Sequence, residues 1–79
     1  MQPIKDLLNQ IKWDKRKNTD EYKILYLDRF KNDLIEIPYN YIKKINGNFI
    51  VLDKNGKDVY IPMHRIKKVK KKHMVMWKR

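Results

Sequence analysis

The chain begins with an apolar pattern of helical spacing. Four apolar residues follow the order i, i+3, i+4 and i+7, namely Ile4, Leu7, Leu8 and Ile11. This spacing places them on one face of an α-helix, and Pro3 suits the first helical position. The pattern predicts a helix over roughly Pro3 to Ile11. Because its polar face is not strongly basic, we expect the apolar face to pack on a sheet rather than on a membrane.

A polar, aperiodic stretch from Lys12 to Glu21 predicts a loop, and short apolar runs separated by turn residues follow it. Such runs are typical of antiparallel strands. The predicted strands are Tyr22–Arg29, Leu34–Ile37, Ile42–Ile45, Phe49–Leu52, Val59–Ile61, Ile66–Val69 and Met74–Trp77. Asn46-Gly47 and Asp53–Gly56 are turn signals between them. We expect one α+β domain over residues 1–79, with the helix packed on a curled antiparallel sheet or small, partly open β-barrel of about six short strands.

An internal repeat spaces two proline turns 24 residues apart. Ile37-Pro38-Tyr39-Asn40-Tyr41-Ile42 matches Ile61-Pro62-Met63-His64-Arg65-Ile66, and a basic stretch follows each. Only the second copy carries a histidine and an arginine at the turn. A polar pair that distinguishes two otherwise similar copies is a candidate for function.

Charge favours a polyanionic partner. The chain holds 20 Lys and Arg against 9 Asp and Glu, which gives a formal net charge of +11. Nucleic acid is the first candidate for such a balance. Residues 61–79 contain eight cations and no acid. Lysines that we expect to contact a nucleic-acid backbone are Lys67, Lys68, Lys70, Lys71 and Lys72. The alternative is a lysine-rich strand edge that prevents aggregation.

Catalytic and metal-binding signatures are scarce. The sequence has no cysteine and no serine, and Thr19 stands alone in the predicted loop, so an activated nucleophile has almost no candidate. His64 and His73 do not begin the His-x-Thr/Ser pattern of cyclic phosphodiesterases. Neither a metal-ligand cluster nor a glycine-rich phosphate loop is recognisable. We therefore expect no enzyme activity, no metal and no cofactor. Without cysteine, a signal peptide or a membrane-length apolar run, a cytoplasmic location is expected.

Phosphate binding has better candidates. A guanidinium offers a planar fork to phosphate oxygens, and an imidazole can add a donor beside it. We expect Arg29, His64 and Arg65 to hold a phosphate, with Asp28 orienting them or accepting a ribose hydroxyl. For Arg29 the alternative is an ion pair with Asp33 or Glu36. Trp13 is interpreted either as a lid over the core or as an exposed stacking platform.

Five motifs together resemble the small archaeal RNA cyclic group end recognition domain over nearly the whole chain. They are Ile11-Lys12-Trp13-Asp14, Tyr26-Leu27-Asp28-Arg29, Glu36-Ile37-Pro38, Ile61-Pro62-Met63-His64-Arg65-Ile66 and Val75-Met76-Trp77-Lys78-Arg79. The sequence departs from the family pattern at Leu25, where a small residue is expected, and at Lys72-His73, where a glycine turn is usual.

The resemblance implies a monomeric, non-catalytic binder of RNA ends that carry a phosphate, often cyclic, in RNA processing or repair. Related domains are fused to RNA ligases or phosphoesterases, which are therefore possible partners. The positions that match the family motifs are Trp13, Asp14, Tyr26, Asp28, Arg29, His64 and Arg65. Among these, Trp13 and Tyr26 are expected to stack a base, and Asp14 and Asp28 to orient groups or contact ribose. The alternatives are a basic architectural or ribosome-associated protein without end preference, and an enzyme acting on the same ends.

Overall fold

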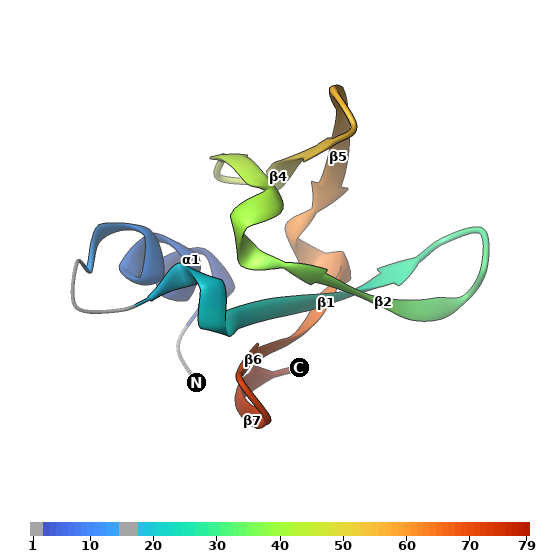
Figure 1. Ribbon diagram of the computed structural model, residues 1–79. Coiled ribbons are helices and arrows are strands. Elements are labelled where there is room, and N and C mark those ends of the chain that lie inside the picture. Colours follow the sequence, from blue (N-terminus) through green and yellow to red (C-terminus); the bar gives the residue numbers. More distant parts are fainter. Residues whose placement is uncertain (1–2, 15–17) are drawn as a thin grey trace.

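The computed structural model describes residues 3–14 and 18–79, which form one helix, seven strands and three short 3-10 segments (Figure 1). The helix α1 spans Ile4–Trp13. The strands are β1 (Tyr22–Asp28), β2 (Asp33–Pro38), β3 (Ile42–Ile45), β4 (Phe49–Lys54), β5 (Lys57–Pro62), β6 (Ile66–Lys71) and β7 (Met74–Lys78). The 3-10 segments are η1 (Thr19–Glu21), η2 (Tyr39–Tyr41) and η3 (Met63–Arg65). Part of the predicted loop, residues 15–17, lies outside the described residues.

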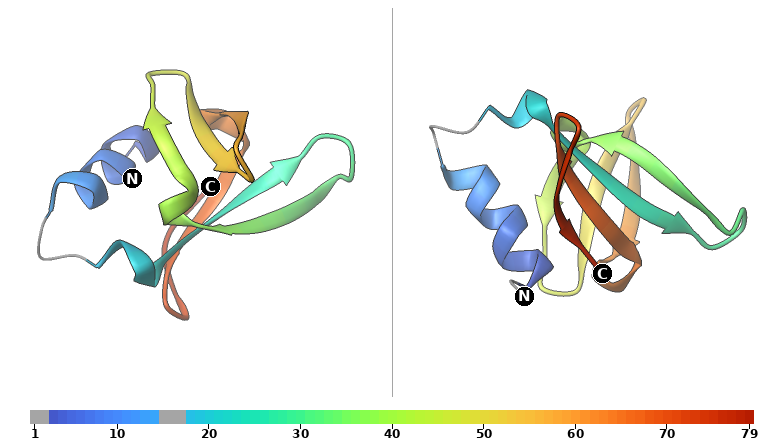
Figure 2. Two further views of the ribbon diagram at one scale, coloured as in Figure 1. Left: turned by 45° about the horizontal axis from the view of Figure 1, so that its top comes forward. Right: turned by 90° about the horizontal axis from the view of Figure 1, so that it is seen from below.

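These strands form two antiparallel sheets. One has four strands in the order β2-β1-β6-β7, and the other has three in the order β3-β4-β5. The α+β class is consistent with this structure, although it is mostly β. The prediction of one curled sheet or partly open barrel is wrong, because the strands pair as two separate sheets. All seven predicted strand segments are present, one more than the overall expectation of about six. Figure 2 shows the two sheets crossing, with α1 at the end opposite the β1–β2 turn.

Two proline segments carry the chain from one sheet to the other. The first runs β2–η2–β3 and the second runs β5–η3–β6. Pro38 has φ −63° and ψ 142°, and Pro62 has φ −60° and ψ 143°. Each proline ends its strand, since it offers no N–H for further pairing. The predicted repeat is confirmed, with β2–β3–β4 equivalent to β5–β6–β7. We call these segments the first crossover (residues 38–42) and the second crossover (residues 62–66).

Helix α1 closes one side of the core. Its predicted apolar stripe is buried in full, and Leu8 and Ile11 have no exposed surface. The helix runs to Trp13, two residues beyond the prediction, and Pro3 is its N-terminal cap. The hydroxyl of Tyr39 donates to the Leu8 carbonyl oxygen at 2.7 Å, which ties the helix to the first crossover. No helix among the described residues is long and apolar enough to cross a membrane.

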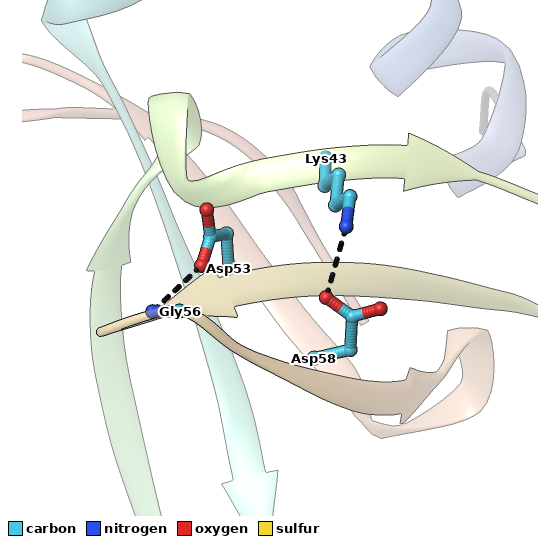
Figure 3. Close-up of polar contacts among 4 residues, drawn as sticks. All are labelled: Lys43, Asp53, Gly56 and Asp58. Carbon is cyan, nitrogen blue, oxygen red and sulfur yellow. Dashed lines mark hydrogen bonds and ion pairs between the residues drawn. The ribbon is translucent and has the colours of Figure 1, made fainter.

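Local polar contacts shape the three-stranded sheet, as Figure 3 shows. Asn55 and Gly56 connect β4 to β5 with φ values of 53° and 82°, the left-handed geometry of a two-residue hairpin turn. The Asp53 carboxylate accepts a hydrogen bond from the Gly56 N–H at 3.1 Å. Lys43 on β3 and Asp58 on β5 contact each other across β4. Lys43 Nζ donates to Asp58 Oδ1 at 3.1 Å, and this hydrogen bond raises the pKa of Lys43. These charges stabilise the sheet and are therefore not free for a ligand.

Candidate phosphate-binding site

Arg29 and Arg65 line one concavity of about 340 Å³. It lies between the end of β1 with the turn that follows it and the end of β5 with the second crossover. Asp28, Phe30, Tyr60 and Pro62 also line it. Two of the three side chains predicted to hold a phosphate are therefore brought together.

Antiparallel pairing of β1 with β6 explains this meeting. Tyr26 is the register partner of Ile66. Arg29 follows Tyr26 by three residues, and Arg65 directly precedes Ile66, so both lie at the same end of the strand pair. Residues 29 and 65 are far apart in the sequence, and only this non-local pairing makes them neighbours.

Asp28 shapes the turn that carries Arg29. Its carboxylate accepts hydrogen bonds from the Phe30 N–H at 2.8 Å and the Lys31 N–H at 3.0 Å. These backbone bonds are the main reason that the pKa of Asp28 is lowered, and the positive charge of Arg65 adds a smaller effect. No hydrogen bond links Asp28 to either His64 or Arg65 among the described residues. Asp28 therefore stabilises the turn. Its single negative charge does not cancel the charges of the two arginines, so the concavity is positive overall.

Neither arginine is neutralised. Within residues 3–14 and 18–79, no ion pair involves Arg29 or Arg65, so the alternative pairing of Arg29 with Asp33 or Glu36 is not made. The Arg29 guanidinium lies 5.2 Å from the centre of the Phe30 ring. The Nε of Arg65 is buried without a hydrogen-bond partner. Two guanidinium groups thus keep unused donors at one concavity.

His64 is separated from the two arginines. It is exposed, it does not line the concavity, and no contact of its side chain is found in the described part of the chain. No observation tests whether His64 contacts a phosphate, so this contact stays a prediction. His73 is exposed in the β6–β7 turn, away from this site.

The structure places the two predicted stacking residues differently. Trp13 is 74% exposed, so its interpretation as a lid is wrong. It is the last residue of α1, and this helix lies at the end of the molecule opposite the β1–β2 turn (Figure 2). Asp14 lies beside it, and its N–H donates to the Gln10 carbonyl oxygen at 3.0 Å. Neither residue joins Arg29 at the concavity.

Tyr26 lines the concavity but has little surface to offer a base. Its side chain is only 5% exposed. Lys54 Nζ donates to the Tyr26 hydroxyl at 3.3 Å and lies 5.9 Å from the ring centre. Tyr26 is therefore a wall of the site and a member of the core rather than an open stacking surface.

Two exposed aromatic rings also line the concavity, and one of them, Phe30, was missed from the sequence. Phe30 is 87% exposed in the β1–β2 turn, and Tyr60 is 61% exposed on β5. Tyr60 contacts Phe49 with ring centres 5.4 Å apart. The signal for Phe30 was available, because a phenylalanine within a polar turn has no strand to pack on.

The lysines predicted to follow a nucleic-acid backbone fall into two groups. Lys70 forms an ion pair with Glu36 at 3.6 Å, and Lys72 forms one with Glu21 at 3.6 Å. Lys72 also adopts φ 56°, the left-handed geometry usually given to glycine, at the turn where the family pattern has one. These two lysines are partly neutralised by the fold.

The remaining members of this set carry no ion pair among the described residues. Lys71 lies 5.8 Å from the centre of the Tyr22 ring. Lys67 and Lys68 stand at the start of β6, immediately after Arg65. Of these three lysines, Lys67 and Lys68 therefore lie toward the end of β6 that adjoins the concavity, whereas Lys71 is at its other end. The same described residues contain no group of three or more His, Cys, Asp or Glu that could hold a metal ion.

Comparison with known proteins identifies relatives along the whole chain. Residues 1–79 match the model of the MJ1316 RNA cyclic group end recognition domain. A UPF0248 protein of Metallosphaera sedula is 41% identical over 76 residues, which cover 96% of this chain and 91% of that protein. A UPF0248 protein of Saccharolobus solfataricus is 33% identical over 79 residues, covering 96% and 95%. No solved structure matches this chain.

The family match spans the candidate site as well as the scaffold. It includes β1 and its turn, the second crossover and the basic strand β6. The resemblance found in the sequence motifs is thereby confirmed. The chain belongs to the MJ1316 RNA cyclic group end recognition domain family, together with archaeal UPF0248 proteins.

Proposed function

We propose that this protein binds RNA ends without catalysis and holds a terminal phosphate, often cyclic, between Arg29 and Arg65. The observation that carries the proposal is that two guanidinium groups without ion pairs line one concavity of about 340 Å³. Charge-assisted hydrogen bonds from arginine to phosphate are strong and directional. The family description names RNA cyclic group end recognition, which supports this ligand.

Phe30 and Tyr60 take the base-stacking role in this proposal. Both rings are exposed and line the concavity that contains the two arginines. Stacking on an aromatic ring binds unpaired bases with little sequence preference. An RNA end, whose last base is unpaired, is therefore a better fit than a closed duplex. Trp13 does not line this concavity, so it has no stacking role in this proposal.

Because the sequence has no serine or cysteine, and its single threonine, Thr19, does not line the concavity, the bound end would be processed by a separate enzyme. An RNA ligase or phosphoesterase is the class of partner that acts on such ends. The protein would then select or protect the end within RNA processing or repair.

A fluorescence titration with matched oligonucleotides tests the proposal. The panel has one RNA sequence with a cyclic phosphate, an open phosphate or a hydroxyl at the 3′ end, together with 5′-phosphorylated RNA and blunt duplex. The proposal expects tighter binding to a phosphate-bearing end than to the hydroxyl end. Equal affinities for all ends would contradict it, and tighter duplex binding would favour a general architectural protein instead.

A further inference from the structure

The outer face of the four-stranded sheet carries two pairs of opposed lysines. Buried Tyr22, Ile24 and Tyr26 of β1 face the core, so Lys23 and Leu25 lie on the opposite, outer face. In the register, Lys23 stands opposite Lys70, and Lys68 stands opposite Lys78. Like charges directly opposite each other destabilise a sheet.

One of these pairs is partly neutralised within the protein. Glu36 lies 3.7 Å from Lys23 Nζ and 3.6 Å from Lys70 Nζ, so its carboxylate bridges both lysines. The repulsion between them is thus relieved by an acid on the neighbouring strand β2.

The other pair has no such acid. Among the described residues, no ion pair involves Lys68 or Lys78. Leu25, not an acid, stands on the other side of Lys68. The free protein therefore holds two opposed ammonium groups without a counterion, an arrangement that a bound anion would relieve.

A second concavity lies at this pair. It measures about 340 Å³ and is lined by Lys68, Lys78, Val75, Met76 and Trp77. Val75 is 44% exposed and Met76 is 46% exposed. Two cations beside exposed apolar side chains suit a phosphodiester with an adjoining sugar or base.

The two concavities are connected along the sheet. Leu27 lines the concavity of Arg65, and Leu25, two residues earlier on the same face of β1, is the register partner of Lys68. Lys68 follows Arg65 by three residues, which corresponds to roughly 10 Å of extended strand. A single-stranded RNA of a few nucleotides can span this distance.

We infer that Lys68 and Lys78 form a second phosphate site, which binds an internal phosphodiester of the same single strand whose end lies between Arg29 and Arg65. This inference rests on the proposed function for the position of the end. It selects Lys68 and Lys78 as the residues that bind the strand and excludes Lys70, because that lysine already forms an ion pair with Glu36.

Lys68→Gln and Lys70→Gln are matched variants for the test, since both residues lie on the outer face of β6. Each variant is titrated with a ten-nucleotide RNA bearing a 3′ cyclic phosphate and with a nucleoside cyclic monophosphate, over a range of salt concentrations. Lys68→Gln should weaken binding of the long RNA about two- to fivefold at low salt. Its salt slope should become shallower by about 0.7, the value for one lost phosphate contact on a single strand. Binding of the mononucleotide should not change.

Lys70→Gln should change neither ligand's affinity. Thermal unfolding of the free proteins gives an independent readout, because Lys68→Gln removes a repulsion and should raise Tm, whereas Lys70→Gln removes an attraction to Glu36 and should lower it. Equal losses of long-RNA affinity in the two variants would overturn the inference. If the unmodified protein shows no end preference, the proposed function is contradicted but the second phosphate site is not. That site is tested separately, by the difference in long-RNA affinity between the Lys68 and Lys70 variants.

Discussion

The first and second crossovers share a backbone but use their polar side chains differently. Their prolines differ by 3° in φ and 1° in ψ (−63° and 142° against −60° and 143°), and a 3-10 turn follows each. In the first, Tyr39 donates to Leu8 of the helix, and Asn40 donates to Asp20. The first crossover therefore uses its polar groups to hold the fold together.

The second crossover has no such internal partners. Met63 is buried at the position equivalent to Tyr39, and it brings no hydroxyl. His64 and Arg65 replace Asn40 and Tyr41, and neither forms a side-chain hydrogen bond within the described residues. The same scaffold therefore uses its polar side chains for internal contacts at the first crossover and, within the part of the chain that the structure describes, leaves His64 and Arg65 without such contacts at the second.

Substitution of the equivalent residues 65 and 41 should give the largest difference between the crossovers. Arg65→Ala removes a charge-assisted contact worth about 1.5–3 kcal/mol. We expect phosphate-ended RNA to bind roughly 10- to 100-fold more weakly, with little change in thermal stability. Tyr41→Ala is the matched control, because Tyr41 is 43% exposed and does not line the concavity of the two arginines. Comparable losses of RNA affinity in both variants, measured by fluorescence anisotropy, would show that the crossovers do not differ in function.

Tyr39→Phe should have the opposite profile: it should lower the stability of the protein and leave RNA binding unchanged. The Leu8 carbonyl oxygen would lose the hydrogen bond from the tyrosine hydroxyl but keep its bond within α1, so the free energy of unfolding should fall by about 0.5–1.5 kcal/mol. Chemical denaturation measures this loss, and RNA affinity should be unchanged. Met63→Leu, at the equivalent position, should cost less than about 1.5 kcal/mol because volume is conserved and no polar group is lost. A larger loss for Met63→Leu would contradict the assignment of the structural role to the first crossover.

Alkaline unfolding adds a check on Tyr39. Burial raises the pKa of Tyr39 to about 12, against 10.0 for an unperturbed tyrosine. Since the folded state holds this proton more tightly, the associated stability is complete below pH 10 and is lost as the pH rises towards 12. Tyr39→Phe should make unfolding between pH 10 and pH 12 less steeply dependent on pH. An unchanged pH dependence would mean that the tyrosine is not protected from water.

Much of this scaffold follows from local sequence pattern. The helical stripe of Ile4, Leu7, Leu8 and Ile11 is buried as predicted, and the repeated Ile-Pro motif marks both crossovers. The pairing of β1 with β6 could not be predicted, because it joins residues 40 or more positions apart and depends on tertiary contacts. That pairing separates the strands into two sheets where one curled sheet was expected.

For the same reason, the candidate site was only partly predicted. Arg29 and Arg65 were found by their chemistry, but their shared concavity depends on non-local pairing. His64 was grouped with Arg65 because they are adjacent in sequence. In a 3-10 turn, however, successive side chains diverge by about 120°, since three residues complete a turn. Phe30 was overlooked because it lies in a turn, outside the apolar runs that predict strands.

Pro38→Ala and Pro62→Ala test whether the two backbones are energetically equivalent. Each variant gives the unfolded chain more conformational freedom and should lower stability by about 0.4–1 kcal/mol. The two losses should agree, because the φ and ψ values agree. A clearly larger loss for Pro62→Ala in denaturant titrations would indicate strain or packing that is specific to the second crossover.

His64→Ala should have the smallest effect. The imidazole does not line the concavity of the two arginines, so we expect phosphate-ended RNA to bind with less than about a threefold change, or about 0.6 kcal/mol. The same anisotropy titration measures it beside Arg65→Ala. A loss as large as that of Arg65→Ala would place His64 at the bound phosphate and restore the three-residue site predicted from the sequence.

A double-mutant cycle on end preference tests most directly whether Arg29 and Arg65 hold one phosphate. The ratio of affinities for cyclic-phosphate and hydroxyl ends of the same RNA is measured for the unmodified protein, Arg29→Ala, Arg65→Ala and the double variant. If both arginines hold the same group, each single variant removes most of the preference, and the double variant loses little more. Independent, additive losses, or an end preference that survives in the double variant, would contradict this account.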